Sequence, residues 1–292
     1  MTEPIDTATG AFIAHRNLLF TIAYEMLGSA ADAEDVLQET WLRWADVNLG
    51  EVQHPRAYLV RMVTRQALTR LRTLSRRRES YVGPWLPEPL LTAPDVAEDV
   101  ELAESVSTAM LLVLETLAPT ERAVFVLREV FDVGYEEIAA AVGKTPAAVR
   151  QIAHRARAHV AARRPRGTVT AAETRDVLAA FRRAVETGDL KGLLDLIAPD
   201  VVLLTDGGGA VRAALTPVIG AAEVAAVLSR LTTTTRLRPL QINGHPALAL
   251  GTDAEPDTIL TLHVTNGRIT SLYAVRNPSK LSHTTHPTPL TR

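Results

Sequence analysis

The 292-residue sequence contains no cysteine. Disulfide bridges, thiolate zinc sites, iron–sulfur clusters, cysteine nucleophiles and direct thiol redox sensing are therefore excluded. The sequence also lacks any apolar run near the roughly 18–20 residues of a membrane-spanning helix. Residues 1–10 lack the basic and then apolar pattern of a secretory signal. We therefore expect a cytoplasmic protein with no membrane partner.

A strong net charge is missing too, because 31 Lys and Arg residues nearly balance 33 Asp and Glu residues. This balance argues against a uniformly basic nucleic-acid-binding surface but leaves room for local basic patches. Hydrophobic residues make up 47% of the chain and charged residues 22%, which is typical of a globular protein. At roughly 100–200 residues per domain, the length indicates two or three domains.

Charge is segregated along the chain. Residues 25–39 carry five acids and no base, and residues 54–78 carry eight arginines and no acid. Residues 85–104 carry six acids and three prolines, whereas residues 144–166 carry one lysine and six arginines without an acid. Two basic segments with an acidic connector between them indicate two nucleic-acid contacts on a hinged chain. Solvated helix faces are the alternative interpretation.

The N-terminal half of the sequence predicts helices. One ends at Gly28, the next begins after Ser29, and a basic helix runs from Pro55 to about Arg78. Residues 135–160 predict a helix-turn-helix, with its turn at Gly143 and with a helix start at Thr145 and Pro146. Its second helix should bury Val149, Ile152, Ala153, Ala156 and Val160 and expose an Arg- and Gln-bearing face. Any antiparallel helix pair is the alternative.

Beyond about residue 170 the pattern predicts an α+β domain of roughly 110 residues. Asn266-Gly267 is a strong two-residue hairpin signal. Residues 282–292 are predicted to be a disordered tail. The predicted helices cover 172–187, 189–197 and 220–231, and the predicted strands cover 201–206, 236–242, 246–250, 258–264 and 268–275.

The segment DAEDVLQETWLRW (32–44), the basic helix after it and the helix-turn-helix together resemble the extracytoplasmic-function sigma factors, group IV of the sigma-70 family. The C-terminal part resembles the SnoaL-like cone-shaped barrels, which one branch of these sigma factors carries. The motifs of that branch stand here as YVGPWLPEP (81–89), DGGG (206–209) and NPSKL (277–281).

The resemblance implies a multidomain protein, with two all-α parts followed by an α+β SnoaL-like domain. Its expected parts are sigma region 2 (1–82), a linker (83–104), the helix-turn-helix of region 4 (105–164), the SnoaL-like regulatory domain (170–281) and the tail. The implied function is that of an RNA polymerase sigma factor, which directs promoter-specific transcription initiation. The implied partners are promoter DNA and the polymerase core, through its β′ coiled coil and β flap. No cofactor is implied.

The resemblance also assigns residues to these contacts. An acidic and apolar helix face suits a basic coiled coil, and the implied polymerase-binding residues are Asp35, Gln38, Glu39 and Trp41. The implied −10 DNA-binding residues are Tyr58, Arg61, Arg65, Arg70 and Arg72, and Tyr58 is either a stacking platform for an unpaired base or a core residue. Arginine pairs with guanine and glutamine with adenine in the major groove. The implied −35 DNA-binding residues are Arg150, Gln151, His154, Arg155 and Arg157.

Regulation in cis by the C-terminal domain is implied by the three branch motifs. The interdomain regulatory residues would be Trp85, Asp206, Gly207, Gly208, Gly209, Asn277, Pro278, Lys280 and Leu281. Two residues depart from the branch pattern: Ala210 stands where lysine is usual, and Ser279 stands where aspartate is usual. A small-molecule effector in the cone is a further candidate partner.

The C-terminal domain also holds candidate acid–base groups, namely Asp206, His245, His263, Tyr273 and Arg276. Ile259, Thr261 and His263 share one strand face, which is a candidate lining for the cone. The more ordinary interpretation is that the histidines bond local carbonyls and that Asp206 is a turn residue, so we expect no enzymatic activity. The alternatives are a stand-alone helix-turn-helix regulator and a SnoaL-type enzyme with an accessory DNA-binding module. The acidic, Trp-bearing helix favours the sigma factor over the stand-alone regulator.

Overall fold

The computed structural model describes residues 4–164, 171–230, 236–251 and 256–292. Its contacts divide the chain into two compact units, each of which is described by itself. Unit 1 comprises Met1–Glu79, Met110–Arg164 and Pro289–Arg292, and unit 2 comprises Ser80–Ala109 and Pro165–Thr288. The predicted start of the C-terminal domain at residue 170 lies just outside the described residues.

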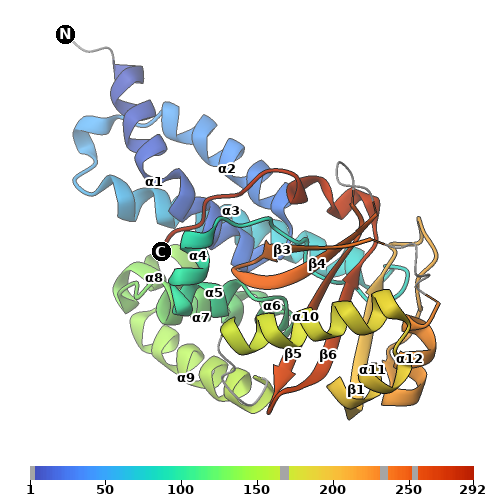
Figure 1. The fold of residues 1–292 in the computed structure, drawn as a ribbon. Helices are drawn as coiled ribbons and strands as arrows, with labels where there is room; N and C mark the ends of the chain where they lie inside the picture. The colour runs from blue at the N-terminus through green and yellow to red at the C-terminus, as the bar shows by residue number, and fades with distance from the viewer. Residues whose placement is uncertain (1–3, 165–170, 231–235, 252–255) are drawn as a thin grey trace. The chain divides into compact units, whose positions relative to one another are not determined.

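The N-terminal part of unit 1 is a group of packed helices (Figure 1). They are α1 (Pro4–Leu27), α2 (Ala30–Ala45), a short 3-10 turn (Leu49–Glu51) and α3 (Pro55–Arg78). Gly28 adopts φ +66° between α1 and α2, and the Ser29 hydroxyl accepts a hydrogen bond of 3.1 Å from the Asp32 amide. Both predicted helix boundaries are confirmed. Trp44 is fully buried, and its indole N–H donates to the Ala8 carbonyl at 2.9 Å.

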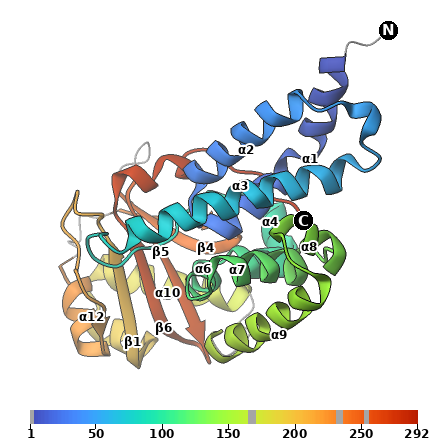
Figure 2. The same cartoon turned by 180° about the vertical axis from the view of Figure 1, so that it is seen from behind.

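The second part of unit 1 contains the helix-turn-helix (Figure 2). Gly143 ends its first helix with φ +68°, and the Thr145 hydroxyl caps the second by accepting from the Ala148 amide at 3.2 Å. The five side chains predicted to be buried on the second helix are all buried. The predicted motif is therefore confirmed. The helices, with a π-helical turn (Val126–Val130) after α7, are α6 (Thr108–Glu115), α7 (Pro119–Phe125), α8 (Tyr135–Val142) and α9 (Pro146–Arg163).

Unit 2 is built on a six-stranded sheet of order β2-β1-β6-β5-β4-β3. Strands β3 to β6 form the predicted antiparallel meander, and β1 is parallel to β6. The sequence pattern missed β2, which has only two residues. The strands are β1 (Ile197–Asp206), β2 (Val218–Ile219), β3 (Leu237–Ile242), β4 (His245–Gly251), β5 (Pro256–Thr265) and β6 (Arg268–Val275); the helices of this part are α10 (Ala171–Thr187), α11 (Leu190–Leu196) and α12 (Ala221–Leu228).

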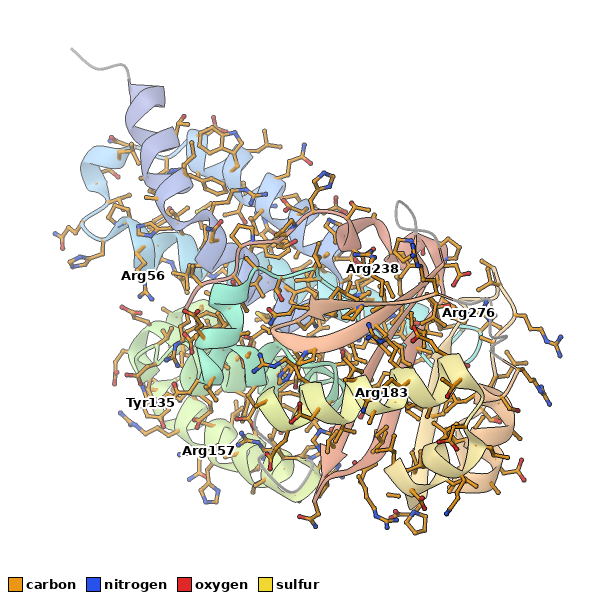
Figure 3. The ribbon with its side chains drawn as sticks, in the orientation of Figure 1. Arg56, Tyr135, Arg157, Arg183, Arg238 and Arg276 are labelled. Carbon is orange, nitrogen blue, oxygen red and sulfur yellow. The ribbon has the colours of Figure 1, made fainter. Side chains whose placement is uncertain are left out.

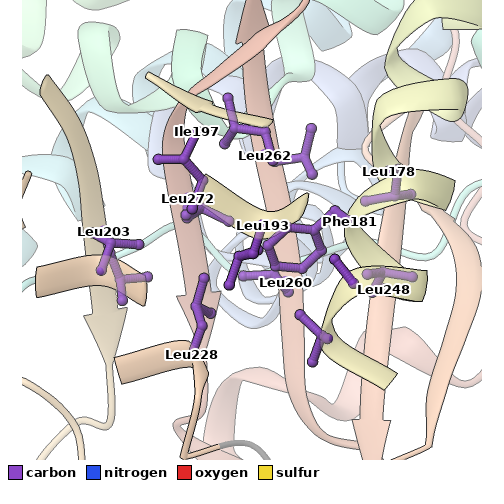
Figure 4. Packing of buried hydrophobic residues seen from close by; sticks show 14 of the residues in the cluster. Leu178, Phe181, Leu193, Ile197, Leu203, Leu228, Leu248, Leu260, Leu262 and Leu272 are labelled. Carbon is purple, nitrogen blue, oxygen red and sulfur yellow. The ribbon is translucent and has the colours of Figure 1, made fainter. Parts of the chain in front are cut away.

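One face of the sheet packs against α10, α11 and α12 (Figure 4). Phe181 and Leu193 from the helices meet Leu260, Leu262 and other strand leucines there. Because side chains alternate along a strand, Thr261 and His263 point to the opposite face. Ile259, Thr261 and His263 thus share one strand face, as predicted, and that face is not the one that packs against these helices.

The predicted linker docks on unit 2, along the edge strand β3, instead of running free. Ser80–Ala109 belongs to unit 2 and includes α4 (Pro94–Glu98) and α5 (Val100–Val106). Leu86 and Leu90 are fully buried, and the Asn243 amide donates to the Leu90 carbonyl at 2.9 Å. The Thr92 amide donates to the Gln241 carbonyl at 3.1 Å. Since β3 is an edge strand, this segment satisfies backbone groups that the sheet leaves unpaired.

The C-terminal tail also differs from the prediction of disorder. The Leu91 amide donates to the His283 carbonyl at 2.9 Å, and the Thr288 amide donates to the Leu91 carbonyl at 2.8 Å. Within unit 1, Leu290 is buried and the Thr291 amide donates to the Thr21 hydroxyl at 3.1 Å. These partners are far away in sequence, so the local composition of the tail could not reveal them.

Two Asn-Gly turns join strands of unit 2, and only one of them was predicted. Asn266-Gly267 joins β5 to β6, and Asn243-Gly244 joins β3 to β4; both dipeptides have positive φ at both positions. Asn243 does more than turn the chain. Its Oδ1 accepts from the Leu90 amide and its Nδ2 donates to the Val106 carbonyl, both at 2.8 Å.

We expect Asn243→Ala to destabilise unit 2 by at least about 2 kcal/mol, because each buried backbone group left unpaired costs about 1–3 kcal/mol. Asn266→Ala is the matched control, since Asn266 has the same backbone conformation but is exposed. Urea unfolding and hydrogen exchange of residues 86–92 would measure the effect. Equal losses in the two variants would show that the buried amide contributes no stability beyond the turn.

Candidate nucleic-acid interface and buried ion-pair site

The acidic surface of α2 is mostly open to solvent. Asp35, Gln38 and Glu39 are exposed, and Trp41 is half-buried with its ring 5.3 Å from that of Phe12. Their spacing along the helix places the three polar side chains on one face. The surface thus combines negative charge with an aromatic edge, which is the chemistry expected for a basic partner.

The aromatic candidate on α3 is partly a core residue. The Tyr58 ring lies 5.7 Å from the Trp44 ring, and the Arg61 guanidinium lies 4.7 Å from the centre of the Tyr58 ring. Arg72 is exposed. Tyr58 is thus half-buried between a core tryptophan and an arginine that lies over its ring, and these contacts fix its orientation.

The other two candidates on α3 already have partners within unit 1. Arg70 bonds Asp32 at 2.7 Å through Nε and Asp35 at 2.9 Å through Nη2. The hydrogen bond to Asp32 raises the pKa of Arg70. Arg65 donates to the carbonyls of Ala140 and Ala141 at 2.7 and 3.4 Å. The structure therefore does not leave the whole arginine face of α3 free.

The five candidates on α9 are all exposed, and Arg157 projects outward from the helix (Figure 3). Arg150 lies over the Tyr135 ring at 5.5 Å and bonds Glu136 at 3.2 Å. Exposed ion pairs of this kind contribute about 0–1 kcal/mol. A base or phosphate can therefore replace them with little loss. Arg155 and Arg157 have similarly loose carboxylate contacts, at 3.8 and 3.7 Å from Glu121 and Glu129.

In unit 2, the fully buried carboxylate of Asp206 joins three parts of the chain. Its Oδ1 accepts from the Tyr81 hydroxyl at 2.6 Å, and its Oδ2 accepts from the Leu86 amide at 2.8 Å and from Lys280 Nζ at 2.7 Å. Lys280 Nζ also donates to the Leu86 carbonyl at 2.6 Å. The end of β1, the linker segment and the NPSKL motif thus meet at one buried ion pair, which is called the Asp206–Lys280 clamp below.

Two linker aromatics surround the cation of the clamp. Lys280 Nζ lies 4.2 Å from the centre of the Trp85 ring and 4.9 Å from that of Tyr81. Burial and the hydrogen bond to Asp206 raise the pKa of Tyr81, so its hydroxyl remains a donor at neutral pH. Asn277 Nδ2 donates to the Tyr81 oxygen at 2.9 Å. These contacts satisfy a cation that would be unstable if it were buried alone.

Two glycines of DGGG stand beside this site at positions where a side chain would not fit. Gly208 has φ +58°, and a Cβ there would lie 2.2 Å from Nδ2 of Asn277. A Cβ on Gly207 would lie 2.4 Å from the Val211 carbonyl oxygen. Pro278 begins a 3-10 turn (Pro278–Lys280), and Leu281 is buried after it. Among the predicted regulatory residues the structure therefore brings together Trp85, Asp206, Gly208, Asn277 and Lys280. Sequence reasoning missed Tyr81, although its motif was recognised.

Three of the acid–base candidates, Asp206, His245 and Arg276, have structural partners, whereas His263 Nε2 is buried without a hydrogen-bond partner among the described residues. His245 Nε2 contacts the Ala103 carbonyl at 2.9 Å, and burial lowers the pKa of His245. Burial and the neighbouring His245 lower the pKa of His263, while burial raises the pKa of Tyr273. Arg276 Nε donates to the Thr258 hydroxyl at 3.2 Å. Asp206 bonds Lys280 instead of a histidine, so the carboxylate–imidazole pair needed for acid–base chemistry is not formed by these residues.

Within the described ranges, no helix has both the length and the apolar character needed to cross a membrane.

Comparisons with known proteins match the two helical parts of unit 1 in turn. The family model of Sigma-70 region 2 matches residues 11–77, and that of Sigma-70, region 4 matches residues 107–160. The stand-alone regulator is not favoured, because both sigma regions are matched on one chain.

Relatives match over nearly the whole chain. The ECF RNA polymerase sigma factor SigJ of Mycobacterium tuberculosis is 34% identical over 291 residues, which covers 93% of this chain and 92% of SigJ. The probable sigma factor SigI of the same species is 32% identical and covers 94% of this chain and 95% of SigI. The crystal structure of M. tuberculosis SigJ superposes with a TM-score of 0.75 at 32% identity, covering 96% of this chain and all of that one. The chain therefore belongs to the ECF RNA polymerase sigma factors, which direct promoter-specific transcription initiation.

Proposed function

We propose that the acidic surface of α2 binds the β′ coiled coil of the RNA polymerase core and that the helix-turn-helix part binds the β flap. The exposure of Asp35, Gln38 and Glu39 supports the first contact, because side chains that are already solvent-accessible can meet a basic partner without a change in the helix. Asp35 shares Arg70 with Asp32, so it contributes less free charge than its neighbours. The protein would act in the cytoplasm, where polymerase and promoter DNA are present.

For the promoter, we propose that α3 contacts the −10 element and α9 the −35 element. The five exposed polar residues of α9 support the second contact, since they form a continuous outer face opposite the buried one. Tyr58 and Arg61 support the first, as a half-buried aromatic ring with a cation beside it suits an unstacked base next to a phosphate. Arg65 and Arg70 must leave their present partners before they bind DNA.

We further propose that unit 2 regulates the sigma regions in cis through the linker. The single observation that carries this proposal is the Asp206–Lys280 clamp, which holds Tyr81, Trp85 and Leu86. Residues 80–109 connect the two DNA-binding regions in the chain, so their docking on unit 2 removes the freedom of that connector.

A small-molecule effector of unit 2 is a separate proposal, and the structure bears only on the chemistry of such a ligand. The face of the sheet that α10–α12 enclose is packed with apolar side chains, so a ligand there would be apolar. We propose no catalytic role for unit 2, because Asp206 and His245 bond structural partners and no carboxylate pairs with a histidine among the described candidates.

In vitro transcription with bacterial core polymerase tests the proposed function. The full chain should initiate at promoters selected from a random library, and core polymerase alone should not. Duplex binding without polymerase, together with no initiation, would contradict it. The full chain is preferable to a truncation at residue 167, which would expose the buried Leu86 and Leu90.

Lys280→Met should change the rate of initiation by roughly tenfold, because a shift of about 1.4 kcal/mol in linker docking changes its equilibrium by that factor. Removing one partner of a buried pair costs about 3–5 kcal/mol. This cost exceeds the shift of about 1.4 kcal/mol that a tenfold change requires. The matched control is the double variant Asp206→Asn with Lys280→Met, which leaves no unpaired charge and keeps an oxygen for the Leu86 amide. Transcription should return towards the wild-type rate in the double variant. Equal rates in all three proteins would refute regulation through the clamp.

Arg150→Ala should weaken binding to selected −35 sequences unequally, by about 1–3 kcal/mol where a guanine contact is lost. Arg163→Ala is the control, because Arg163 is exposed in the last turn of the same helix. It should weaken binding to all sequences alike and lower the salt dependence. Equal loss across sequences for Arg150→Ala, measured with holoenzyme on a promoter library, would contradict the assignment of α9 to −35 recognition.

A further inference from the structure

The turn between β3 and β4 in unit 2 holds the linker helix α5 through three consecutive residues. Asn243 Nδ2 donates to the Val106 carbonyl at 2.8 Å, and His245 Nε2 lies 2.9 Å from the Ala103 carbonyl oxygen. Between them, Gly244 packs so closely on the helix that a Cβ there would lie 2.7 Å from Cβ of Ala103. Close contacts therefore fix the place of α5 on unit 2, and His245 is the titratable group of the three.

A second histidine lies beside His245 on the same face of the sheet. Ala247 faces Thr261 across the antiparallel pair of β4 and β5, so His245 falls opposite His263 in the same register. On its other side, His263 faces Ser271 of β6. Its Nε2 is buried and has no hydrogen-bond partner among the described residues. Two imidazoles thus share one partly buried strip of the sheet, next to the place where α5 docks.

The hydrogen bonds of this strip suit neutral imidazoles. A carbonyl oxygen only accepts, so His245 Nε2 carries the proton of the neutral ring and donates it to Ala103. A second proton would go to Nδ1 and make the ring a cation. As a cation, His263 would carry a proton on its buried Nε2, which would be an unpaired donor away from water. Protonation of both rings would also place like charges opposite each other on adjacent strands, which is destabilising.

The surroundings of the pair favour its neutral form. Burial lowers the pKa of both histidines, and the neighbouring His245 lowers the pKa of His263 further. The hydrogen bond to the Ala103 carbonyl and the half-buried Glu104 on α5 raise the pKa of His245, but burial outweighs them. On β6, burial raises the pKa of Tyr273, so this neighbour stays uncharged. The other acids of α5 and its cap are Glu101 and Asp99.

We propose that His245 and His263 form a pH-sensitive latch, which holds α5 on unit 2 while both imidazoles are neutral and releases it when the pH falls. The linker contains α5, so its release would free part of the connector between the two sigma regions. The effect of release on initiation rests on the proposed regulation through the linker, whereas the release itself does not.

Proton linkage gives the direction and the size of the effect. A histidine in water has a pKa of about 6.5, and the docked histidines have lower values. The docked state is therefore favoured fully above pH 6.5 and loses this advantage as the pH falls. For a histidine that binds no proton while α5 is docked, the ratio of released to docked helix rises about tenfold between roughly pH 7.5 and pH 5.5. Two such histidines would raise it up to about a hundredfold.

Hydrogen exchange of the α5 amides in the full chain tests the latch. Exchange rates, divided by the intrinsic rates at each pH, report the opening equilibrium of the helix even when the released form is rare. In the wild-type chain the protection of these amides should fall by about tenfold or more between roughly pH 7.5 and pH 5.5. A fall of less than about threefold would overturn the proposal.

His245→Gln tests the chemistry of the latch in the same measurement. Glutamine does not titrate, and its amide can still donate to the Ala103 carbonyl. The variant should keep α5 protected at neutral pH and lose about a factor of ten of the pH response. His286→Gln is the matched control, since it removes an exposed histidine from the same unit. This control should respond to pH as the wild type does, and equal responses in all three proteins would refute the latch.

An NMR titration of the histidine side chains gives a second readout on the wild-type chain. The signals of His245 and His263 can be assigned through their neighbours in the sheet. We expect both to have a pKa well below the ordinary value of about 6.5. A pKa at or above that value for either histidine would overturn the proposal. This measurement decides the question by itself if His245→Gln does not fold.

Discussion

The carboxylate of Asp206 is fully buried at the end of β1, and a buried charge is stable only with a partner and hydrogen bonds. Lys280 supplies the charge, while Tyr81 and the Leu86 amide supply the hydrogen bonds. These partners come from the linker and from a motif more than seventy residues after Asp206. The pair therefore specifies where the linker docks, and the leucines of the linker are buried within the same unit.

Because the linker docks on unit 2, the connector between the two sigma regions is part of that unit. A free connector of about thirty residues would let two DNA-binding modules take many separations. The connector is instead bonded to β3, to the Asn243 turn and to the clamp. Arg65 and Arg70, two of the proposed −10 contacts, also bond within unit 1.

Much of the fold was predictable because it depends on local chemistry. The turn at Gly143, the cap at Thr145 and the buried face of α9 each follow from residue type and helical spacing, and the structure confirms them. The meander and the Asn266-Gly267 turn follow from alternation and positive φ in the same way. By contrast, the charge pattern of the sequence did not predict the surroundings of two residues. Glu25 was counted in a solvated acidic segment but is buried, and Arg78 lies in an ion cluster instead of at a phosphate-binding surface.

The sequence by itself determined the sigma regions, the exposed recognition face and the three motifs, because each is encoded within a few residues. Only the tertiary structure decided which residues those motifs bind. Tyr81 meets Asp206, Asn243 holds Leu90, and Arg65 caps α8 across separations of 75 to 153 residues. Sequence spacing carries no information on such pairs, since burial selects them after the chain has folded: a polar group removed from water must be satisfied by whichever partner the packing places beside it.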